Sequence, residues 1–337
     1  MRANLYHGGQ LQRAAASYGI ARERWLDLST GISPFVYPIP SLPQAVWQRL
    51  PEEEDGLLTA AADYYGSRDL LVVAGSQAVI QRLPELIGAA RLLRVALLSP
   101  GYYEYAVAWQ RAGHEIIEVA AAEAVSLIGA QLPRLDVVVV VNPNNPSATT
   151  IPAAILWQWQ QQLQQQGGWL VVDEAYMDAT PEGSLLAAGP AAVANLLLLR
   201  SLGKFFGLAG LRLGFLHASA ALRQRAAALL GPWAVSHPSR FVATAALQDR
   251  PWQQWQRQRL AEATQRLQQL LVETIGAGQA TPLFHWLPRN DASALHQFLA
   301  QRAILTRLFD QPAGLRIGLP ATEVEWQRLT QALADYA

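Results

Sequence analysis

The 337-residue sequence contains no cysteine, which excludes disulfides, thiolate metal sites and cysteine nucleophiles. Charged residues make up only 15 % of the chain, and 26 Lys and Arg balance 26 Asp and Glu. A net charge of +0 gives no overall field that would attract nucleic acid or an anionic membrane. The most apolar runs, 137–141 and 196–199, are far shorter than the roughly 20 residues of a membrane-spanning helix. We therefore predict no nucleic-acid partner and no membrane partner.

Other absences narrow the function further. No basic segment followed by an apolar core opens the chain, so the sequence favours a cytoplasmic protein. The Gly-x-Gly-x-x-Gly and Walker patterns are missing, which weakens NAD and ATP as ligands. We also predict no metal site. Hydrophobic residues nonetheless account for 51 % of the chain, which excludes disorder as its dominant state.

Short apolar runs alternate with helical stretches in the middle of the chain. Each run is bounded by turn residues, and most are apolar throughout, as is typical of strands covered on both faces. This pattern predicts an α/β fold with a mainly parallel sheet between helices. The expected strands are 70–74, 94–98, 137–141, 169–172, 196–199 and 213–217.

From about residue 221 onward, long helical stretches such as 256–274 replace the alternating strands and helices. Short strand candidates follow near 283–287 and 315–318. This change predicts a smaller α+β domain. We expect residues 1–40 to form an N-terminal arm and part of the small domain, 41–220 the large domain, and 221–337 the small C-terminal domain. No strong periodicity marks the arm.

One lysine stands in a segment rich in glycine and apolar residues, Arg-Ser-Leu-Gly-Lys-Phe-Phe-Gly-Leu-Ala-Gly-Leu-Arg-Leu-Gly at 200–214. Apolar surroundings would disfavour the charged form of Lys204 and leave the amine free to form a Schiff base. Arg212 follows eight positions later. A solvated loop lysine is the alternative interpretation of the same segment.

A carboxylate follows the expected strand 169–172 directly. Asp173, delivered to the end of a sheet, needs a partner, because an unpaired buried carboxylate is neutralised. A protonated pyridine nitrogen and a helix N-terminus are both suitable partners. Tyr176, three residues later, either donates to a phenolate oxygen or is a half-buried core residue.

Two further loops follow expected strands. Asn142-Pro143-Asn144-Asn145-Pro146 comes after five valines and forms either a plain rigid turn or a binding loop with projecting amides. Gly75-Ser76-Gln77 ends a strand and begins a helix, where free N–H groups attract an anion such as phosphate. An ordinary serine N-cap explains the second loop equally well.

In combination, these four segments resemble the pyridoxal-phosphate enzymes of the aspartate aminotransferase fold, in particular the histidinol-phosphate aminotransferase branch. The opening His7-Gly8-Gly9, the segment Trp-Leu-Asp-Leu-Ser-Thr-Gly-Ile-Ser-Pro at 25–34 and the C-terminal Gly-Leu-Arg-Ile-Gly-Leu-Pro at 314–320 resemble the threonine-phosphate decarboxylases of cobalamin biosynthesis. The resemblance covers nearly the whole chain.

The resemblance implies fold type I and pyridoxal 5'-phosphate as the cofactor. Lys204 would hold the cofactor and move protons at the substrate Cα, and Asp173 would keep the pyridine nitrogen protonated, which makes the ring an electron sink. Tyr176 and Asn145 would bond the phenolic oxygen, and Tyr102 would stack on the ring, with Tyr103 and Tyr105 as weaker candidates. The cofactor phosphate would contact Gly75, Ser76, Gln77, Ser201 and Arg212.

The resemblance also implies a substrate site. Arg316 would clamp the substrate carboxylate, and Arg307, His7 and Gly8 would surround its phosphate or carboxylate; a surface position and a salt bridge to Asp310 are alternatives for Arg307. Asn145 and Gly31 would also lie near the substrate. Three positions depart from the family pattern: Gly31 replaces an expected Asn, Gly203 a Ser or Thr, and Leu50 a Tyr contributed by the partner subunit.

The implied reaction is decarboxylation of L-threonine O-3-phosphate to (R)-1-amino-2-propanol O-2-phosphate by a homodimer. The bond that breaks at Cα is the one held perpendicular to the cofactor ring, so groups gripping the carboxylate and side chain select the reaction. An aminotransferase acting on histidinol phosphate or a related amino acid uses the same cofactor residues and is the alternative. A non-catalytic cofactor-binding or scaffold protein is the least favoured interpretation, because such a protein would be expected to have lost Lys204 or Asp173, and both are present.

Overall fold

The structure is a computed structural model that describes residues 7–88, 90–187 and 192–336. These residues form two compact units. The smaller unit contains the described residues up to Phe35, the short segment Pro146–Ala148 and the chain from Trp255 onward. The larger unit contains Val36–Asn145 and Thr149–Gln254.

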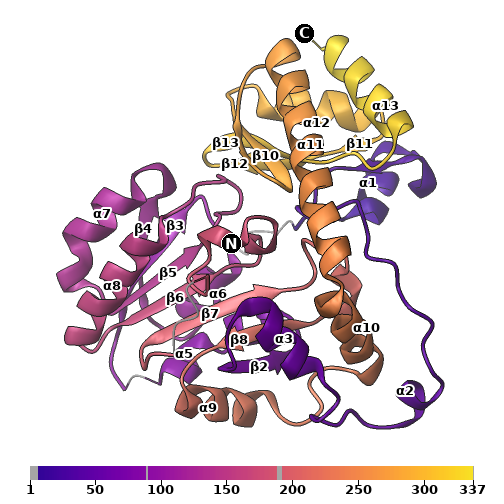
Figure 1. Ribbon diagram of the computed structural model, residues 1–337. Coiled ribbons are helices and arrows are strands. Elements are labelled where there is room, and N and C mark those ends of the chain that lie inside the picture. Colours follow the sequence, from indigo (N-terminus) through magenta and orange to yellow (C-terminus); the bar gives the residue numbers. More distant parts are fainter. Residues whose placement is uncertain (1–6, 89, 188–191, 337) are drawn as a thin grey trace. The chain divides into compact units, whose positions relative to one another are not determined.

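A seven-stranded sheet forms the centre of the larger unit in the described part of the chain (Figure 1). Neighbouring strands from β7 through β6, β5 and β3 to β4 run parallel, whereas β8 is antiparallel to both β7 and β2. This arrangement confirms the predicted α/β class with a mainly parallel sheet. In sheet order the strands are β2 Leu70–Val73, β8 Gly214–His217, β7 Leu196–Ser201, β6 Trp169–Asp173, β5 Val137–Val141, β3 Arg94–Ser99 and β4 Glu115–Ala120.

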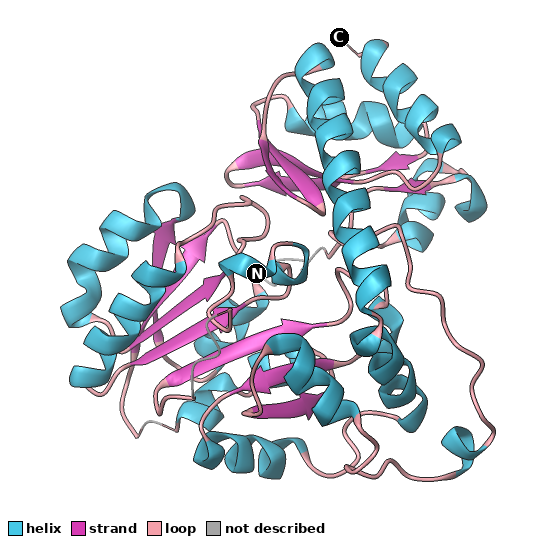
Figure 2. Ribbon diagram, viewed as in Figure 1, coloured by secondary structure: helices cyan, strands magenta, loops and turns pink. Residues whose placement is uncertain are grey.

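The central strands are apolar because helices cover both faces of the sheet (Figure 2). All five residues of β5 are buried. Alternate side chains of β5 pack in one core cluster with α4, α5, α6 and α9, and α8 packs on β6. The helices of this unit are α2 Ala45–Gln48, α3 Leu57–Tyr65, α4 Ser76–Ile80, α5 Leu83–Ile87, α6 Glu104–Arg111, α7 Ala124–Gln131, α8 Ala153–Gln165, α9 Ala220–Leu230 and α10 His237–Gln248.

The smaller unit contains an antiparallel sheet in the order β12-β13-β10-β9 and a separate parallel pair, β1 with β11. The 25-residue helix α11, Arg250–Thr274, begins in the larger unit and continues into this one. The other elements are α1 Leu11–Tyr18, β1 Leu26–Asp27, β9 Gln279–Thr281, β10 Phe284–Pro288, α12 Ala292–Gln301, β11 Ile304–Leu305, β12 Arg307–Asp310, β13 Ala313–Gly318 and α13 Glu323–Ala334.

Three features differ from the sequence expectations. Strand β4 was not expected, because its residues 115–120 are mostly solvent-accessible at the sheet edge and lack a continuous apolar run. The arm contains a regular helix, α1, whose Ala14 packs with Trp25 and Ala300. Helices α9 and α10 belong to the larger unit, so the division between the units falls within α11 rather than at residue 220.

Candidate active site

Seven chain segments meet at one edge of the large sheet. Because β2 and β7 are each antiparallel to β8, they run in the same direction, as do β3, β5 and β6. One edge therefore collects the carboxyl ends of these five strands and the amino end of β8, together with the carboxyl end of β4, which is parallel to β3. In open α/β sheets ligands bind at this edge. All the cofactor residues expected from the sequence lie in or beside these segments, within the larger unit.

Asp173 ends β6 and is buried, with 3 % of its surface exposed. Its Oδ1 accepts a hydrogen bond from the Ala175 N–H at 3.0 Å, and its Oδ2 accepts one from the Tyr105 hydroxyl at 2.9 Å. Burial raises the pKa of Asp173 to about 6, while these two donors and the charge of Lys204 oppose the rise. The site thus holds a carboxylate whose charge is sensitive to its partners.

Lys204 follows β7 and is half-buried. Its Nζ lies 5.6 Å from the ring centroid of the buried Tyr176, and its charge acts on Asp173. The flanking residues Leu202 and Phe205 are fully buried. Lys204, Asp173 and Tyr176 therefore lie within electrostatic range of one another, at or just beyond the ends of the neighbouring strands β6 and β7.

Gly75, Ser76 and Arg212 form a cradle at the ends of β2 and β8. Gly75 has φ +71°, and a Cβ placed there would lie 2.9 Å from the Arg212 Nη2 atom. A Cβ on Gly214 would lie 3.1 Å from the Ser76 nitrogen and would also clash with the Arg200 carbonyl. Only glycine leaves the backbone and the guanidinium this close together. The cradle presents an N–H group and a guanidinium, both of which bind phosphate.

The glycine that precedes the lysine fits the same region. A Cβ on Gly203 would lie 3.2 Å from the Ala209 Cα, a contact tighter than is usual. The Ser201 hydroxyl accepts a hydrogen bond from the Gly203 N–H at 3.3 Å. The departure at Gly203 is therefore accommodated by close packing of the loop on Ala209, and Ser201 remains as the hydroxyl next to the lysine segment.

Tyr102 and Gln77 connect the ends of β3 and β2. The Tyr102 hydroxyl donates to Gln77 Oε1 at 2.9 Å, and Gln77 Nε2 donates to Glu104 Oε2 at 2.6 Å. Burial raises the pKa of Tyr102, and the charges of Glu104 and Asp173 raise it further, so the phenol stays protonated. This chain of bonds fixes the Tyr102 side chain beside the aspartate.

The asparagine loop after β5 is held by its own amides. The Asn142 side chain bonds both the N–H and the carbonyl of Ile151, at 2.8 and 3.0 Å. Asn144 donates to the Pro100 carbonyl at 2.8 Å, which ties this loop to the loop after β3. Asn145, the residue expected to bind, is half-buried and follows these anchored positions.

Apart from Asn145, which belongs to the larger unit, the expected substrate residues lie in the smaller unit. There a pocket of about 290 Å³ is lined by His7, Gly8, Ser29 and Arg307. Gly8 packs so closely on the Ser29 backbone that a Cβ would clash with it, and the Gly9 N–H donates to the Ser29 hydroxyl at 2.7 Å. The structure thus brings together the two segments, 7–9 and 25–34, that carried the N-terminal part of the resemblance.

Two arginines occupy facing positions on neighbouring strands. Arg307 of β12 pairs in register with Arg316 of β13, and Arg316 Nη2 donates to the Ser29 carbonyl at 2.5 Å. Burial and the Arg316 charge lower the pKa of Arg307 to about 10, and Asp310 opposes this effect. Arg307 thus remains protonated at neutral pH. Gly31 is buried but is not among the described residues that line the pocket.

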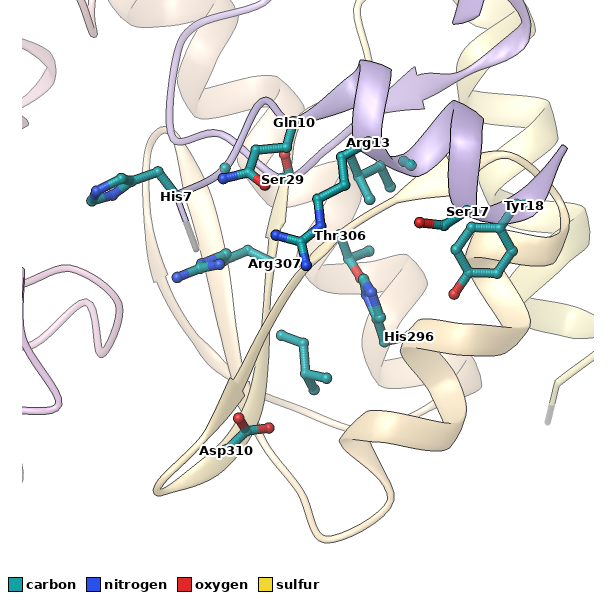
Figure 3. A pocket seen from close by; sticks show the side chains of 14 residues that line it. His7, Gln10, Arg13, Ser17, Tyr18, Ser29, His296, Thr306, Arg307 and Asp310 are labelled. Carbon is teal, nitrogen blue, oxygen red and sulfur yellow. The ribbon is translucent and has the colours of Figure 1, made fainter. Parts of the chain in front are cut away.

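Sequence reasoning missed several other residues of this pocket, Arg13 and His296 among them. Figure 3 shows Arg13 extending from α1 into the region above Thr306 and Arg307, with His296 below. His296 Nδ1 and the buried Thr306 hydroxyl are 2.8 Å apart. Burial and the Arg307 charge lower the pKa of His296. The i, i+4 spacing of Arg13 and Ser17, in a segment without strong periodicity, gave no signal that this face lines a cavity.

Among the described residues, no helix combines the length and apolar character needed to cross a membrane. In the same residues, no group of three or more His, Asp and Glu side chains is arranged to hold a metal ion.

The fold, with a lysine, an aspartate and an anion cradle at one sheet edge, defines a protein of the aminotransferase class. The chain belongs to the aminotransferase class I and II family, whose model matches residues 51–333. It is 49 % identical over 335 residues to a threonine-phosphate decarboxylase of Pseudomonas aeruginosa, covering 98 % of both chains. It is 40 % identical to a threonine-phosphate decarboxylase of a Sinorhizobium species, covering 99 % of both chains.

The fold also matches solved structures. Histidinol-phosphate aminotransferase from Sinorhizobium meliloti, in complex with pyridoxal-5'-phosphate, superposes with a TM-score of 0.82 at 22 % sequence identity. The match covers 98 % of this chain and 95 % of that one. It confirms the predicted fold type.

Proposed function

We propose that this chain is a pyridoxal-phosphate-dependent decarboxylase that converts L-threonine O-3-phosphate to (R)-1-amino-2-propanol O-2-phosphate and CO2, a step of cobalamin biosynthesis. The observation that carries the proposal is 49 % identity, across 98 % of both chains, to a protein named threonine-phosphate decarboxylase. In this reaction the Cα–carboxylate bond breaks and a proton takes the place of the carboxylate, so no oxidant or acceptor is consumed.

The residues at the large-sheet edge fit pyridoxal 5'-phosphate. The Ser76 N–H and the Arg212 guanidinium suit its phosphate, the buried anionic Asp173 suits its pyridinium nitrogen, and the Lys204 amine suits its aldehyde. When bound, the cofactor supplies an electron sink for the pair left at the substrate Cα. We expect the purified wild type to be yellow and Lys204→Ala to lose the covalent link. A colourless wild type that takes up no cofactor would contradict this fit.

Four side chains divide the chemical work. Lys204 is placed to hold the cofactor covalently and then to deliver the proton that replaces the lost carboxylate at Cα. Asp173 keeps a proton on the facing ring nitrogen by remaining anionic. Tyr176 and Asn145 donate to the phenolic oxygen and so set the charge next to the reacting atoms. The support for these roles is the electrostatic range within which Lys204, Asp173 and Tyr176 lie.

The basic pocket of the smaller unit supplies the substrate specificity. Arg307, with His7 and Gly8, binds the substrate phosphate, because two charge-assisted bonds from one guanidinium suit a dianion. Arg316 holds the substrate carboxylate, and Gly31 lies in the adjoining backbone. Holding the carboxylate perpendicular to the cofactor ring directs the reaction to the C–C bond. The support for this assignment is the pairing of Arg307 with Arg316 across β12 and β13.

An aminotransferase acting on histidinol phosphate is the second candidate, favoured by the TM-score of 0.82 to such an enzyme. The cofactor residues serve both reactions, so a substrate panel separates them. We expect threonine phosphate alone to be consumed without any keto acid. Turnover of histidinol phosphate that depends strictly on a keto-acid acceptor, with no reaction of threonine phosphate, would establish the aminotransferase instead.

We further propose that the protein acts as a homodimer in the cytoplasm. Three apolar side chains of the larger unit, Trp47, Leu50 and Trp233, are each at least 60 % exposed and would be covered by a second copy. Light scattering of the purified protein is expected to give a mass near twice 36.9 kDa. A monomeric mass at micromolar concentration would contradict the dimer.

A further inference from the structure

Tyr105 makes a contact that its position in the sequence did not reveal. It lies in the first turn of α6, is 2 % exposed, and donates its hydroxyl to Asp173 Oδ2 at 2.9 Å across 68 residues of sequence. The Tyr105 ring meets Tyr102 edge-on, with centroids 6.2 Å apart. Tyr105 therefore packs against Tyr102, the residue expected to stack on the cofactor ring, while its hydroxyl group bonds to Asp173.

The two partners hold each other in the protonation states that this bond needs. Burial raises the pKa of Tyr105, and the Asp173 charge and hydrogen bond raise it further, so the phenol remains a donor. In return, the Tyr105 hydrogen bond is the largest of the effects that lower the pKa of Asp173 against its burial. The Ala175 N–H satisfies the other oxygen, Oδ1. A carboxylate accepts about four hydrogen bonds, so beside these two donors Asp173 retains capacity for a donor from the cofactor.

We propose that Tyr105 is a positioning residue, which orients the Asp173 carboxylate and keeps it anionic so that it can pair with the protonated pyridine nitrogen of the cofactor. This inference rests on the proposed function only in requiring a pyridoxal-phosphate enzyme; it does not depend on which amino acid is the substrate. Tyr105 does not touch the reacting atoms. Its effect on catalysis passes entirely through Asp173.

A buried tyrosine also needs a hydrogen-bond partner for its own stability, so the experiment must separate the two roles. The variant Tyr105→Phe keeps the ring and removes only the donor. Tyr65→Phe is the matched control, since Tyr65 is equally enclosed in the same unit but its ring packs on the Arg200 guanidinium at 4.6 Å. Both variants are expected to fold, as judged by circular dichroism.

For Tyr105→Phe we expect three changes in the cofactor-loaded protein. The variant loses a hydrogen bond to a charged group, and bonds of this kind are stronger than those between neutral groups. We therefore expect kcat to fall by about tenfold, with KM within about twofold of wild type. The affinity for pyridoxal phosphate falls. The midpoint of the pH titration of the cofactor absorbance, which reports protonation of the nitrogen that joins Lys204 to the cofactor, rises. The reason is that a less positively charged ring nitrogen repels a proton on that nitrogen less strongly. Tyr65→Phe leaves all three unchanged.

A double variant tests the route through Asp173. Once Asp173→Asn has removed the anion, adding Tyr105→Phe is expected to leave cofactor affinity and the pH midpoint unchanged. Additive effects of the two substitutions, or a Tyr105→Phe enzyme with wild-type spectrum, affinity and kcat, would overturn the inference. Failure of the proposed substrate is a separate result: the wild type would bind the cofactor with the expected Tyr105 dependence yet release no CO2 from threonine phosphate.

Discussion

Arg200 Nη1 lies 2.5 Å from Glu174 Oε2, and both side chains are almost completely buried. Its Nη2 pairs with Asp178, the Ser184 hydroxyl donates to Glu174 Oε2 at 2.5 Å, and the Tyr65 ring packs on the guanidinium. The two carboxylates raise the pKa of Arg200 despite its burial, so it stays charged. This closed network ties the end of β6, which carries Asp173, to the end of β7, which Lys204 follows.

We predict that Arg200→Met strongly destabilises the protein. The substitution leaves Glu174 and Asp178 buried without their cation, a change that costs about 3–5 kcal/mol. Urea unfolding monitored by fluorescence measures this loss. The control is Arg82→Met, which removes an exposed partner of Glu85 and should change the free energy of unfolding by less than about 1 kcal/mol. Equal effects of the two substitutions would show that the buried network contributes no special stability.

Arg316→Ala should abolish most catalysis without removing the cofactor. The side chain is buried and is proposed to hold the substrate carboxylate, and truncating one partner of such a pair costs about 2–5 kcal/mol. We therefore expect kcat/KM to fall by roughly 30-fold or more, with cofactor absorbance retained. The variant must first be shown to fold, because Arg316 also donates to Ser29. An unchanged kcat/KM would mean that another residue holds the carboxylate.

Arg307→Gln should weaken recognition of the phosphate. A charge-assisted bond contributes about 1.5–3 kcal/mol, so we expect KM for threonine phosphate to rise by about 10- to 100-fold. The cofactor affinity should not change, since Arg307 and the cofactor residues lie in different units. Arg302→Gln, an exposed change on the same unit, is the control. If both variants had the same KM as wild type, the phosphate would have to bind elsewhere.

The buried His285 predicts a pH dependence of stability. Burial lowers its pKa to about 4, and neither ring nitrogen has a hydrogen-bond partner among the described residues. Below about pH 6.5 the unfolded histidine binds a proton that the folded one does not, so stability falls as the pH drops from about 6.5 toward 4.

His285→Leu removes this contribution. Between pH 7 and pH 5 the variant should lose roughly 2 kcal/mol less free energy of unfolding than wild type. Asp173, whose pKa is raised to about 6, takes up a proton in the folded state over part of this range and opposes the trend equally in both proteins. Urea unfolding at the two pH values measures the difference, with half-buried His237→Asn as the control. If the free energy of unfolding of His285→Leu fell between pH 7 and pH 5 as steeply as that of wild type, the prediction would be contradicted.

Much of the large unit could be predicted from the sequence because its strands are buried on both faces. The run Val137–Val141 is a strand in both the prediction and the structure, and β6 extends the predicted 169–172 by one residue to Asp173. Strand β4 and helix α1 escaped prediction, since an accessible edge strand and an eight-residue helix carry weak periodicity.

The positions of Lys204 and Asp173 near neighbouring strand ends could be predicted, because each motif lies at or shortly after the end of an apolar strand. The site was not predictable where tertiary packing creates the contact. Tyr105 was a weak candidate for ring stacking, and no spacing rule links it to an aspartate 68 residues away. Arg13 enters the pocket of the smaller unit only because α1 packs on residues near position 300. The individual site roles remain predictions for the experiments above.

Release of CO2 from carboxyl-labelled L-threonine O-3-phosphate is the most direct test of the account. The purified, cofactor-loaded protein should release labelled CO2 over many turnovers without any keto acid, and leave an equal amount of aminopropanol phosphate. Lys204→Ala is the blank. If wild type and blank released the same trace amount while wild type kept its bound cofactor, the central claim of decarboxylation would be contradicted.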